Sequence, residues 1–182
     1  MPEWFNGTAW RAVPSLRARE FKSHPLRMKI KNPELHRIVA TAIIHKDGKY
    51  LIVKRSPNKK AFPGRWTVPG GGLEVNDYIN LPKTTADAWY FAIENSLRRE
   101  IKEEVGLEVG KINYLLSLTF IRPNNTPVVT LSYYCDWKSG EVKLNEENID
   151  YNWVTVEEAK SYDLIEGISE EIEMVDKILK GG

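Results

Sequence analysis

The sequence has very little cysteine and no long hydrophobic run. Cys135 is its single cysteine, so no disulfide can form within one chain. No apolar stretch approaches the roughly 18 residues that a membrane-spanning helix requires. The first residues, Met-Pro-Glu-Trp-Phe, lack the basic and then apolar segments of a secretory signal, and no repeat or low-complexity segment is found. These absences argue against a secreted disulfide scaffold and a membrane protein, and we expect a cytoplasmic location.

Length and composition are those of one globular domain with a sizeable core. The chain has 182 residues, of which 28% are charged and 42% hydrophobic. Its net charge of +1 is unevenly spread, because residues 1–65 hold 15 Lys and Arg against 4 Asp and Glu, whereas residues 141–176 hold 12 acidic residues against 2 lysines. Either the basic part attracts a polyphosphate or the two parts simply face each other, and the second explanation is slightly favoured. The aromatic residues form no evident stacking surface, so no specific nucleic-acid partner is expected.

One stretch near the middle of the chain, residues 99–107, reads as the end of a helix with an acidic face. Glu100, Glu103 and Glu104 are three and four residues apart, so their side chains share one side of the helix. A separate apolar stripe recurs every four residues: Ile93, Leu97, Ile101 and Val105. Gly106 stands where a left-handed residue would end the helix.

Three like charges on one helix face repel one another unless something offsets them. A divalent cation does so, and Mg²⁺ prefers carboxylate oxygens, water and phosphate. The alternative is an ordinary solvated helix face. A glycine-rich run at residues 66–74, upstream of this helix, favours the metal site.

These residues resemble the signature of the Nudix hydrolases, G-x5-E-x7-R-E-U-x-E-E-x-G-U, where U is a bulky aliphatic residue. The second half of the signature matches at Arg99, Glu100, Ile101, Glu103, Glu104, Gly106 and Leu107. Gly71 fits the opening glycine, but Asp77 stands where the family has its first glutamate. Between Asp77 and Arg99 lie 21 residues rather than seven, which implies an insertion of 21 − 7 = 14 residues, Tyr78 to Phe91.

The resemblance implies an α/β fold, a Nudix α/β/α sandwich with a mixed central sheet. It divides the chain into an N-terminal arm, residues 1–36, and a Nudix hydrolase domain, residues 37–182. It also implies an enzyme that uses Mg²⁺, with Mn²⁺ possible, to hydrolyse a nucleoside diphosphate linked to another group.

The same resemblance assigns roles to the charged residues. Glu100, Glu103 and Glu104 become metal ligands, and Arg99 orients a carboxylate, with Asp77 as a possible partner although its side chain is one methylene shorter. The general base is left open among Glu103, Glu100 and Glu147, a glutamate six residues before a tryptophan as in a recurring Nudix segment. For Glu147 an acidic surface turn is nearly as good an explanation.

Substrate contacts are expected from the loop before the glycine-rich run. Arg55 and Arg65 are candidates to meet phosphate oxygens, and Gly71 allows close approach of the backbone. For either arginine alone, a solvated loop is the simpler explanation. We favour a (deoxy)nucleoside triphosphate pyrophosphohydrolase. The alternatives are an ADP-ribose or other nucleotide-sugar pyrophosphatase, suggested by Pro123 sixteen residues after Leu107, and a non-catalytic nucleotide-sensing domain.

Periodicity and turn residues predict the elements around these motifs. Strands are expected at 37–45, 50–54, 66–69, 111–121, 127–137 and 150–155, with a possible edge piece at 142–144; a loop at 70–72; and helices from near Ala86 to Val105, capped by Thr84 or Thr85, at 156–162 and at 167–179.

Two aromatic groups have no assigned place. Trp4, Phe5 and Trp10 of the arm either cover the core or form a homodimer contact or a wall of the substrate site. The run 89–91, Trp-Tyr-Phe, either flanks a bound base or packs on the arm.

Overall fold

The computed structural model describes residues 34–181. The predicted arm, with Trp4, Phe5 and Trp10, therefore lies almost entirely outside the described residues.

An eight-stranded mixed sheet forms the centre of the fold. Its strands are β1 (Arg37–Lys46), β2 (Lys49–Arg55), β3 (Trp66–Thr67), β4 (Gly70–Gly72), β5 (Glu108–Val109), β6 (Asn113–Ile121), β7 (Pro127–Ser139) and β8 (Asn148–Val154). β1 and β7 pair in parallel, and the other strand pairs are antiparallel. The helical elements are η1 (Val75–Asp77), α1 (Ala92–Val105), α2 (Val156–Ala159) and α3 (Ile168–Leu179).

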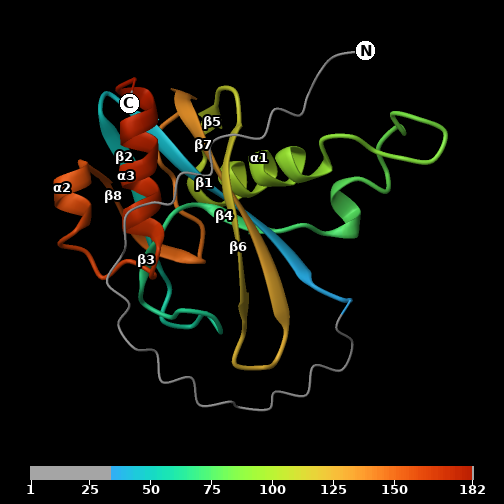
Figure 1. Ribbon diagram of the computed structural model, residues 1–182, viewed down its shortest axis with the longest axis horizontal. Helices are drawn as coiled ribbons and strands as arrows, with labels where there is room; N and C mark the ends of the chain where they lie inside the picture. The colour runs from blue at the N-terminus through green and yellow to red at the C-terminus, as the bar shows by residue number, and fades with distance from the viewer. Residues whose placement is uncertain (1–33, 182) are drawn as a thin grey trace, which may run out of the picture.

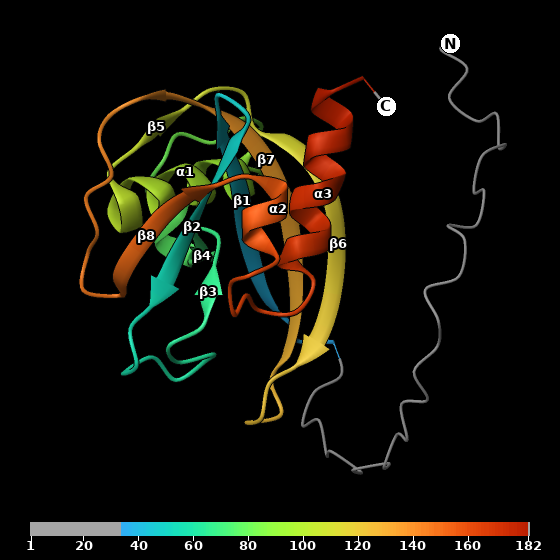
Figure 2. The same cartoon turned by 90° about the vertical axis from the view of Figure 1, so that its left-hand side faces the viewer.

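Helices cover both faces of this sheet, as Figures 1 and 2 show: α1 lies on one side, and α2 and α3 lie on the other. Successive residues of a strand point to opposite faces. In β1, Ala40, Ala42 and Ile44 accordingly belong to the core under α1, while Ile43 belongs to the core under α3. The predicted α/β/α sandwich with a mixed sheet is confirmed. None of the helices within residues 34–181 has both the length and the apolar character needed to cross a membrane.

β1 and β2 separate soon after the hairpin that joins them. Their pairing is confined to residues 45–50, next to the Asp-Gly turn. Farther along, β4 pairs with β1 through Thr41 and Gly70, and β3 pairs with β2 through Val53 and Thr67. Residues 70–72 are therefore a short strand rather than the expected loop, because three glycines leave their backbone free to pair with β1. This strand places the glycines directly beside α1, whose residues it contacts.

α1 begins at Ala92 rather than near Ala86. Phe91 precedes it with a left-handed φ of 59°, and the hydroxyls of Thr84 and Thr85 accept hydrogen bonds from the N–H groups of Tyr90 and Ala88 inside the insertion. The two threonines therefore stabilise a turn instead of capping a helix. At the other end Gly106, with φ 72°, terminates α1 as expected.

The segment 142–144 is not an edge strand. The N–H of Lys143 donates to the carbonyl of Val105, and that of Asn145 donates to the carbonyl of Glu104. Residues 143–145 therefore satisfy carbonyl groups that would otherwise be unpaired at the C-terminal end of α1.

Candidate active site

Arg99 is the centre of a network that joins three carboxylates. Its Nε and Nη2 donate to Asp77 (2.5 and 3.3 Å), Nη2 also donates to Glu100 (2.9 Å), and Nη1 donates to Glu103 (2.7 Å). Burial alone would raise the pKa of Asp77, but hydrogen bonds from Arg99, the Glu74 N–H and Ser96 hold it below its usual value. The shorter side chain of Asp77 thus still reaches Arg99, and the arginine is fixed in place next to Glu100.

Glu104 lies on the side of α1 that faces the glycine strand. Its side chain is buried, with the residue only 4% exposed, and one oxygen accepts a hydrogen bond from the Gly70 N–H at 3.0 Å. Burial raises the pKa of Glu104 to about 7, and the negative charges of Glu100 and Glu147 act in the same direction. The carboxylate is therefore fixed by a backbone hydrogen bond, and the positive charge of Arg55 only partly opposes the effect of burial on its pKa.

Glu100 occupies the space that a side chain at Gly71 would fill. A Cβ atom added to Gly71 would lie 2.2 Å from the carboxyl carbon of Glu100. Burial raises the pKa of Glu100; Arg99 opposes this effect, and the charges of Glu103 and Glu147 add to it. Gly71 is thus required for the close approach of Glu100 to β4.

Glu147 comes to the same place from the segment just before β8. Lys59, from the loop after β2, forms an ion pair with its carboxylate. Since its charge acts on both Glu100 and Glu104, Glu147 belongs to the same electrostatic cluster.

Glu103 points away from this cluster, toward solvent. Its side chain is 55% exposed and contacts Nη1 of Arg99. Within residues 34–181 no three His, Cys, Asp or Glu side chains converge closely enough to hold a metal ion as they stand. The structure therefore brings Glu100, Glu104 and Glu147 into one electrostatic cluster, and Glu103 acts on Glu100 from a more exposed position.

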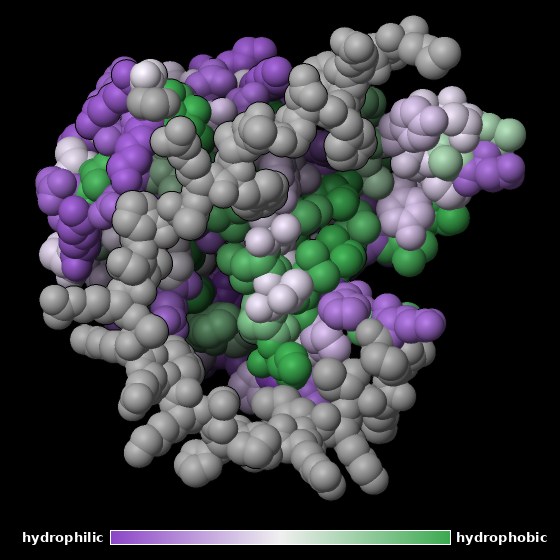
Figure 3. Space-filling view, in the orientation of Figure 1, coloured by the Kyte–Doolittle hydropathy of each residue, from purple (hydrophilic) through white to green (hydrophobic). Residues whose placement is uncertain are grey.

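A cavity of about 880 Å³ runs from these carboxylates across the α3 side of the sheet. Its charged and glycine lining consists of Arg37, Arg55, Lys59, Lys60, Arg65, Gly70, Gly71, Gly72, Glu74, Glu100, Glu104, Arg122, Glu147, Glu166 and Glu171. Its apolar part includes Val39, Leu118 and Phe120. Figure 3 shows hydrophobic residues gathered along the middle of the face that carries β6, with hydrophilic residues at the margin.

The two predicted phosphate-binding arginines differ in their contacts. The guanidinium of Arg65 binds the loop between α2 and α3. Its Nη2 donates to the Leu164 carbonyl (2.5 Å), and its Nε lies 3.0 Å from the Asp163 carboxylate. Arg55 donates from Nε to the Ala61 carbonyl at 3.0 Å and pairs with no carboxylate within residues 34–181. Arg55 is therefore the more available of the two.

The chemistry of the donor set fits a divalent cation. Glu100 and Glu104 are carboxylates one helical turn apart, packed against a glycine strand, and they share a cavity with Glu147. Hard oxygen donors of this kind suit Mg²⁺ and Mn²⁺. A positive ion placed there would offset the burial and repulsion that raise the pKa values of Glu100 and Glu104.

Sequence reasoning missed four charged residues of the cavity, namely Arg37, Arg122, Glu166 and Glu171. Arg37 begins β1 and Arg122 follows β6, so neither stands near the signature. Glu171 is buried on α3, accepts a hydrogen bond from Ser132 Oγ (2.5 Å), and has a pKa raised by that burial. An acidic residue on the buried face of a predicted amphipathic helix was the one available signal.

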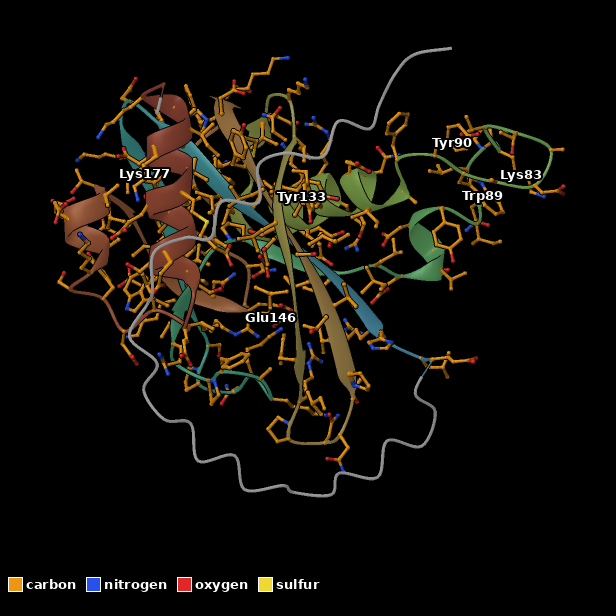
Figure 4. The ribbon with its side chains drawn as sticks, in the orientation of Figure 1. Lys83, Trp89, Tyr90, Tyr133, Glu146 and Lys177 are labelled. Carbon is orange, nitrogen blue, oxygen red and sulfur yellow. The ribbon has the colours of Figure 1, made fainter. Side chains whose placement is uncertain are left out.

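The aromatic run of the insertion does not flank this cavity. The rings of Tyr78 and Trp89 are in contact, with centres 5.4 Å apart and planes tilted by 54°, and Trp89 Nε1 donates to the Leu81 carbonyl. They line a separate hollow of about 410 Å³ at the start of α1. Figure 4 shows Lys83, Trp89 and Tyr90 on a loop that projects beyond α1, far from Glu146.

Comparison with known proteins gives a consistent result. A family model described as NUDIX domain matches residues 34–175. The nucleoside triphosphatase NudI of Escherichia coli is 32% identical over 139 residues, which cover 70% of this chain and 88% of that protein.

Solved structures share the fold at lower identity. The MutT protein of Methanosarcina mazei has a TM-score of 0.62 at 23% identity, covering 82% of this chain and 99% of that one. The NUDIX domain of Shewanella oneidensis NrtR, solved in complex with ADP ribose, has a TM-score of 0.60 at 20% identity. The match covers 81% of this chain and 93% of that one.

Proposed function

This chain belongs to the Nudix family and is a Nudix-type pyrophosphohydrolase, and from that premise we propose that it hydrolyses nucleoside triphosphates with the help of Mg²⁺. Nudix hydrolases generally depend on a divalent metal. The observation that carries the proposal is the position of Glu100 and Glu104, which lie against Gly70 and Gly71 at the end of a cavity rich in arginine and lysine.

The proposed cation site consists of Glu100 and Glu104, and Glu147 lines the same cavity as a candidate general base. When bound there, a divalent cation supplies positive charge to the phosphates and makes water a better nucleophile. Glu103 interacts with Arg99 and is exposed, so we assign it to the support of Arg99 rather than to direct cation binding.

Each of these three carboxylates is held by a neighbouring group. The Gly70 N–H orients Glu104, Arg99 orients Glu100, and Lys59 pairs with Glu147. Among the candidate bases we favour Glu147, because it comes from a different part of the chain and faces the two helix carboxylates. Accepting a proton from water would release its ion pair with Lys59, which is then free to meet a phosphate oxygen.

The choice of nucleoside triphosphates is supported by the relative at 32% identity, which is named a nucleoside triphosphatase. The size of the cavity and its six basic side chains suit a nucleotide with several phosphates: Arg37, Arg55, Lys59, Lys60, Arg65 and Arg122.

A panel of nucleoside triphosphates, ADP-ribose and nucleotide sugars, assayed with Mg²⁺ and with Mn²⁺, tests the proposal. We expect triphosphates to be turned over and Glu100→Gln and Glu104→Gln each to abolish most of that turnover. Glu108→Gln is the matched control. This exposed glutamate forms an ion pair with Lys102, feels the more distant charges of Arg98 and Lys138, and lies outside the cavity. Preferred turnover of ADP-ribose would contradict the substrate assignment, and normal turnover in both glutamine variants would exclude the site.

A further inference from the structure

Three arginines from separate elements line the same cavity as Glu100 and Glu104. Arg37 is the first residue of β1, Arg55 is the last of β2, and Arg122 follows the end of β6. None of the three forms an ion pair with a carboxylate of residues 34–181. Within the described residues, the fold therefore gathers three positive charges that form no direct ion pair.

Among the three arginines, Arg122 has a buried hydrogen-bond donor that lacks an acceptor within the described residues. This donor is its Nε. Burial lowers the pKa of Arg122, and the positive charges of Arg37 and Arg55 lower it further. A buried donor without an acceptor destabilises the folded protein, and an anion bound in the cavity would supply the missing acceptor.

Arg37 lies across the glycine strand from Glu100, whereas Arg55 is close enough to act on the charge of Glu104. A Cβ atom on Gly72 would lie 2.2 Å from Nη2 of Arg37, whereas a Cβ atom on Gly71 would lie 2.2 Å from the carboxyl carbon of Glu100. Consecutive residues of a strand face opposite ways, so Arg37 and Glu100 flank β4 on its two sides. The cavity includes both residues, so an anion bound near Arg37 lies in the same space as the carboxylates of α1.

We propose that Arg37, Arg55 and Arg122 form an anion subsite that holds a phosphate group beyond those that face the carboxylates. A triphosphate has such a group, whereas in a nucleotide sugar a neutral sugar takes its place. Guanidinium groups bind phosphate oxygens through short charge-assisted hydrogen bonds. The subsite thus deepens the proposed function by selecting triphosphates, and it rests on that function for its biological role.

Inorganic triphosphate is the probe that tests the subsite apart from catalysis. Its binding is measured by calorimetry on the full chain with EDTA present, so that no divalent cation contributes. We expect Arg122→Gln and Arg37→Gln each to weaken binding about tenfold or more, and Arg122→Lys to weaken it less, since lysine keeps the charge. Lys138→Gln is the charge-matched control, because Lys138 is exposed on β7 and outside the cavity. Equal affinity of all variants and the wild type would overturn the proposal.

Thermal unfolding of the ligand-free protein separates this role from a structural one. Replacing Arg122 removes its repulsion by Arg37 and Arg55, so we expect Arg122→Gln to raise the Tm while it weakens triphosphate binding. A lowered Tm together with unchanged binding would show that Arg122 only supports the fold.

The turnover panel distinguishes failure of the subsite from failure of the proposed function. If triphosphates are hydrolysed but Arg122→Gln and Arg37→Gln leave KM unchanged, the subsite is wrong and the function stands. If no triphosphate is hydrolysed but binding of inorganic triphosphate still depends on the arginines, the function is wrong and the subsite stands.

Discussion

The guanidinium of Arg99 holds the carboxylate of Asp77, 22 residues earlier in the chain, through two hydrogen bonds of 2.5 and 3.3 Å. The contact closes the 14-residue insertion at its base, because Asp77 ends η1 and Arg99 lies within α1. The Asp77 side chain is only 4% exposed, so no water replaces a lost partner there. The insertion thus extends the loop without separating the two halves of the signature.

Replacing this carboxylate tests its positioning role. We expect Asp77→Asn to lower the free energy of unfolding by about 1.5–3 kcal/mol, the range for a hydrogen bond to a charged group. It should also lower kcat, because Arg99 would no longer be fixed beside Glu100. Urea unfolding and steady-state kinetics give the two values. Asp87→Asn, the same change at an exposed site in the insertion, should alter neither; comparable effects in both variants would remove the special role of Asp77.

Two neighbouring glycines should respond differently to alanine. In Gly71→Ala the new methyl group displaces the Glu100 carboxylate, and a displacement of about 1 Å in a catalytic group can reduce kcat/KM about 100-fold. In Gly72→Ala the methyl group meets the movable end of Arg37, so KM should rise more than kcat falls. Kinetics on both variants, with circular dichroism to verify folding, make the comparison. The reverse pattern would contradict the assignment of the two sides of β4.

Glu104 gives the metal-free protein a defined pH dependence. Its pKa in the folded state is about 7, above the ordinary 4.5, so between these values the folded protein binds more protons than the unfolded one. The contribution of Glu104 to the free energy of unfolding should therefore be largest below pH 4.5. It should fall by about 3 kcal/mol as the pH rises to 7. Urea titrations in EDTA at several pH values measure the effect. Glu104→Gln should flatten the slope in that window, and an unchanged slope would show that another group is responsible.

The amino-terminal arm is a separate unit in the sequence-based prediction, and removing it tests that division. Deletion of residues 1–26 should leave kcat/KM unchanged, because all the residues of the proposed site lie between Arg37 and Glu171. If the arm forms a homodimer contact, size-exclusion chromatography with light scattering should show a dimer that becomes a monomer on deletion. A monomer both before and after deletion would rule out the dimer role.

Local patterns predicted the elements that are decided locally. The apolar stripe of Leu97, Ile101 and Val105 located the buried side of α1, and Gly106 located its end. The start of α1 was placed six residues too early, because Thr84 and Thr85 are good capping residues whose hydroxyls instead bind N–H groups inside the insertion. Nothing in the local sequence distinguishes these two uses of a threonine.

The site likewise contains residues that local spacing predicts and residues that only the folded sheet brings together. Glu100, Glu103 and Glu104 were predicted from their spacing of three and four residues on one helix, and in the structure Glu103 pairs with Arg99. The separation of their roles depends on β4, which covers only part of the helix face. Arg37 and Arg122 come together because β1, β7 and β6 lie side by side in the sheet, a long-range relation that spacing along the chain does not reveal.

The insertion is expected to be dispensable for catalysis. No residue from 75 to 99 lines the cavity, and the two limbs of the loop lie close together at Tyr78 and Trp89. Replacing residues 79–88 with a short Gly-Ser linker should therefore leave kcat/KM within about twofold of wild type, as is usual for surface changes. Trp89→Ala is the companion variant, since it removes the ring in contact with Tyr78 but keeps the loop length. A large loss of kcat/KM in the linker variant at an unchanged Tm would mean that the insertion reaches the substrate during turnover, whereas unchanged kinetics in both variants would limit its role to the surface beyond α1.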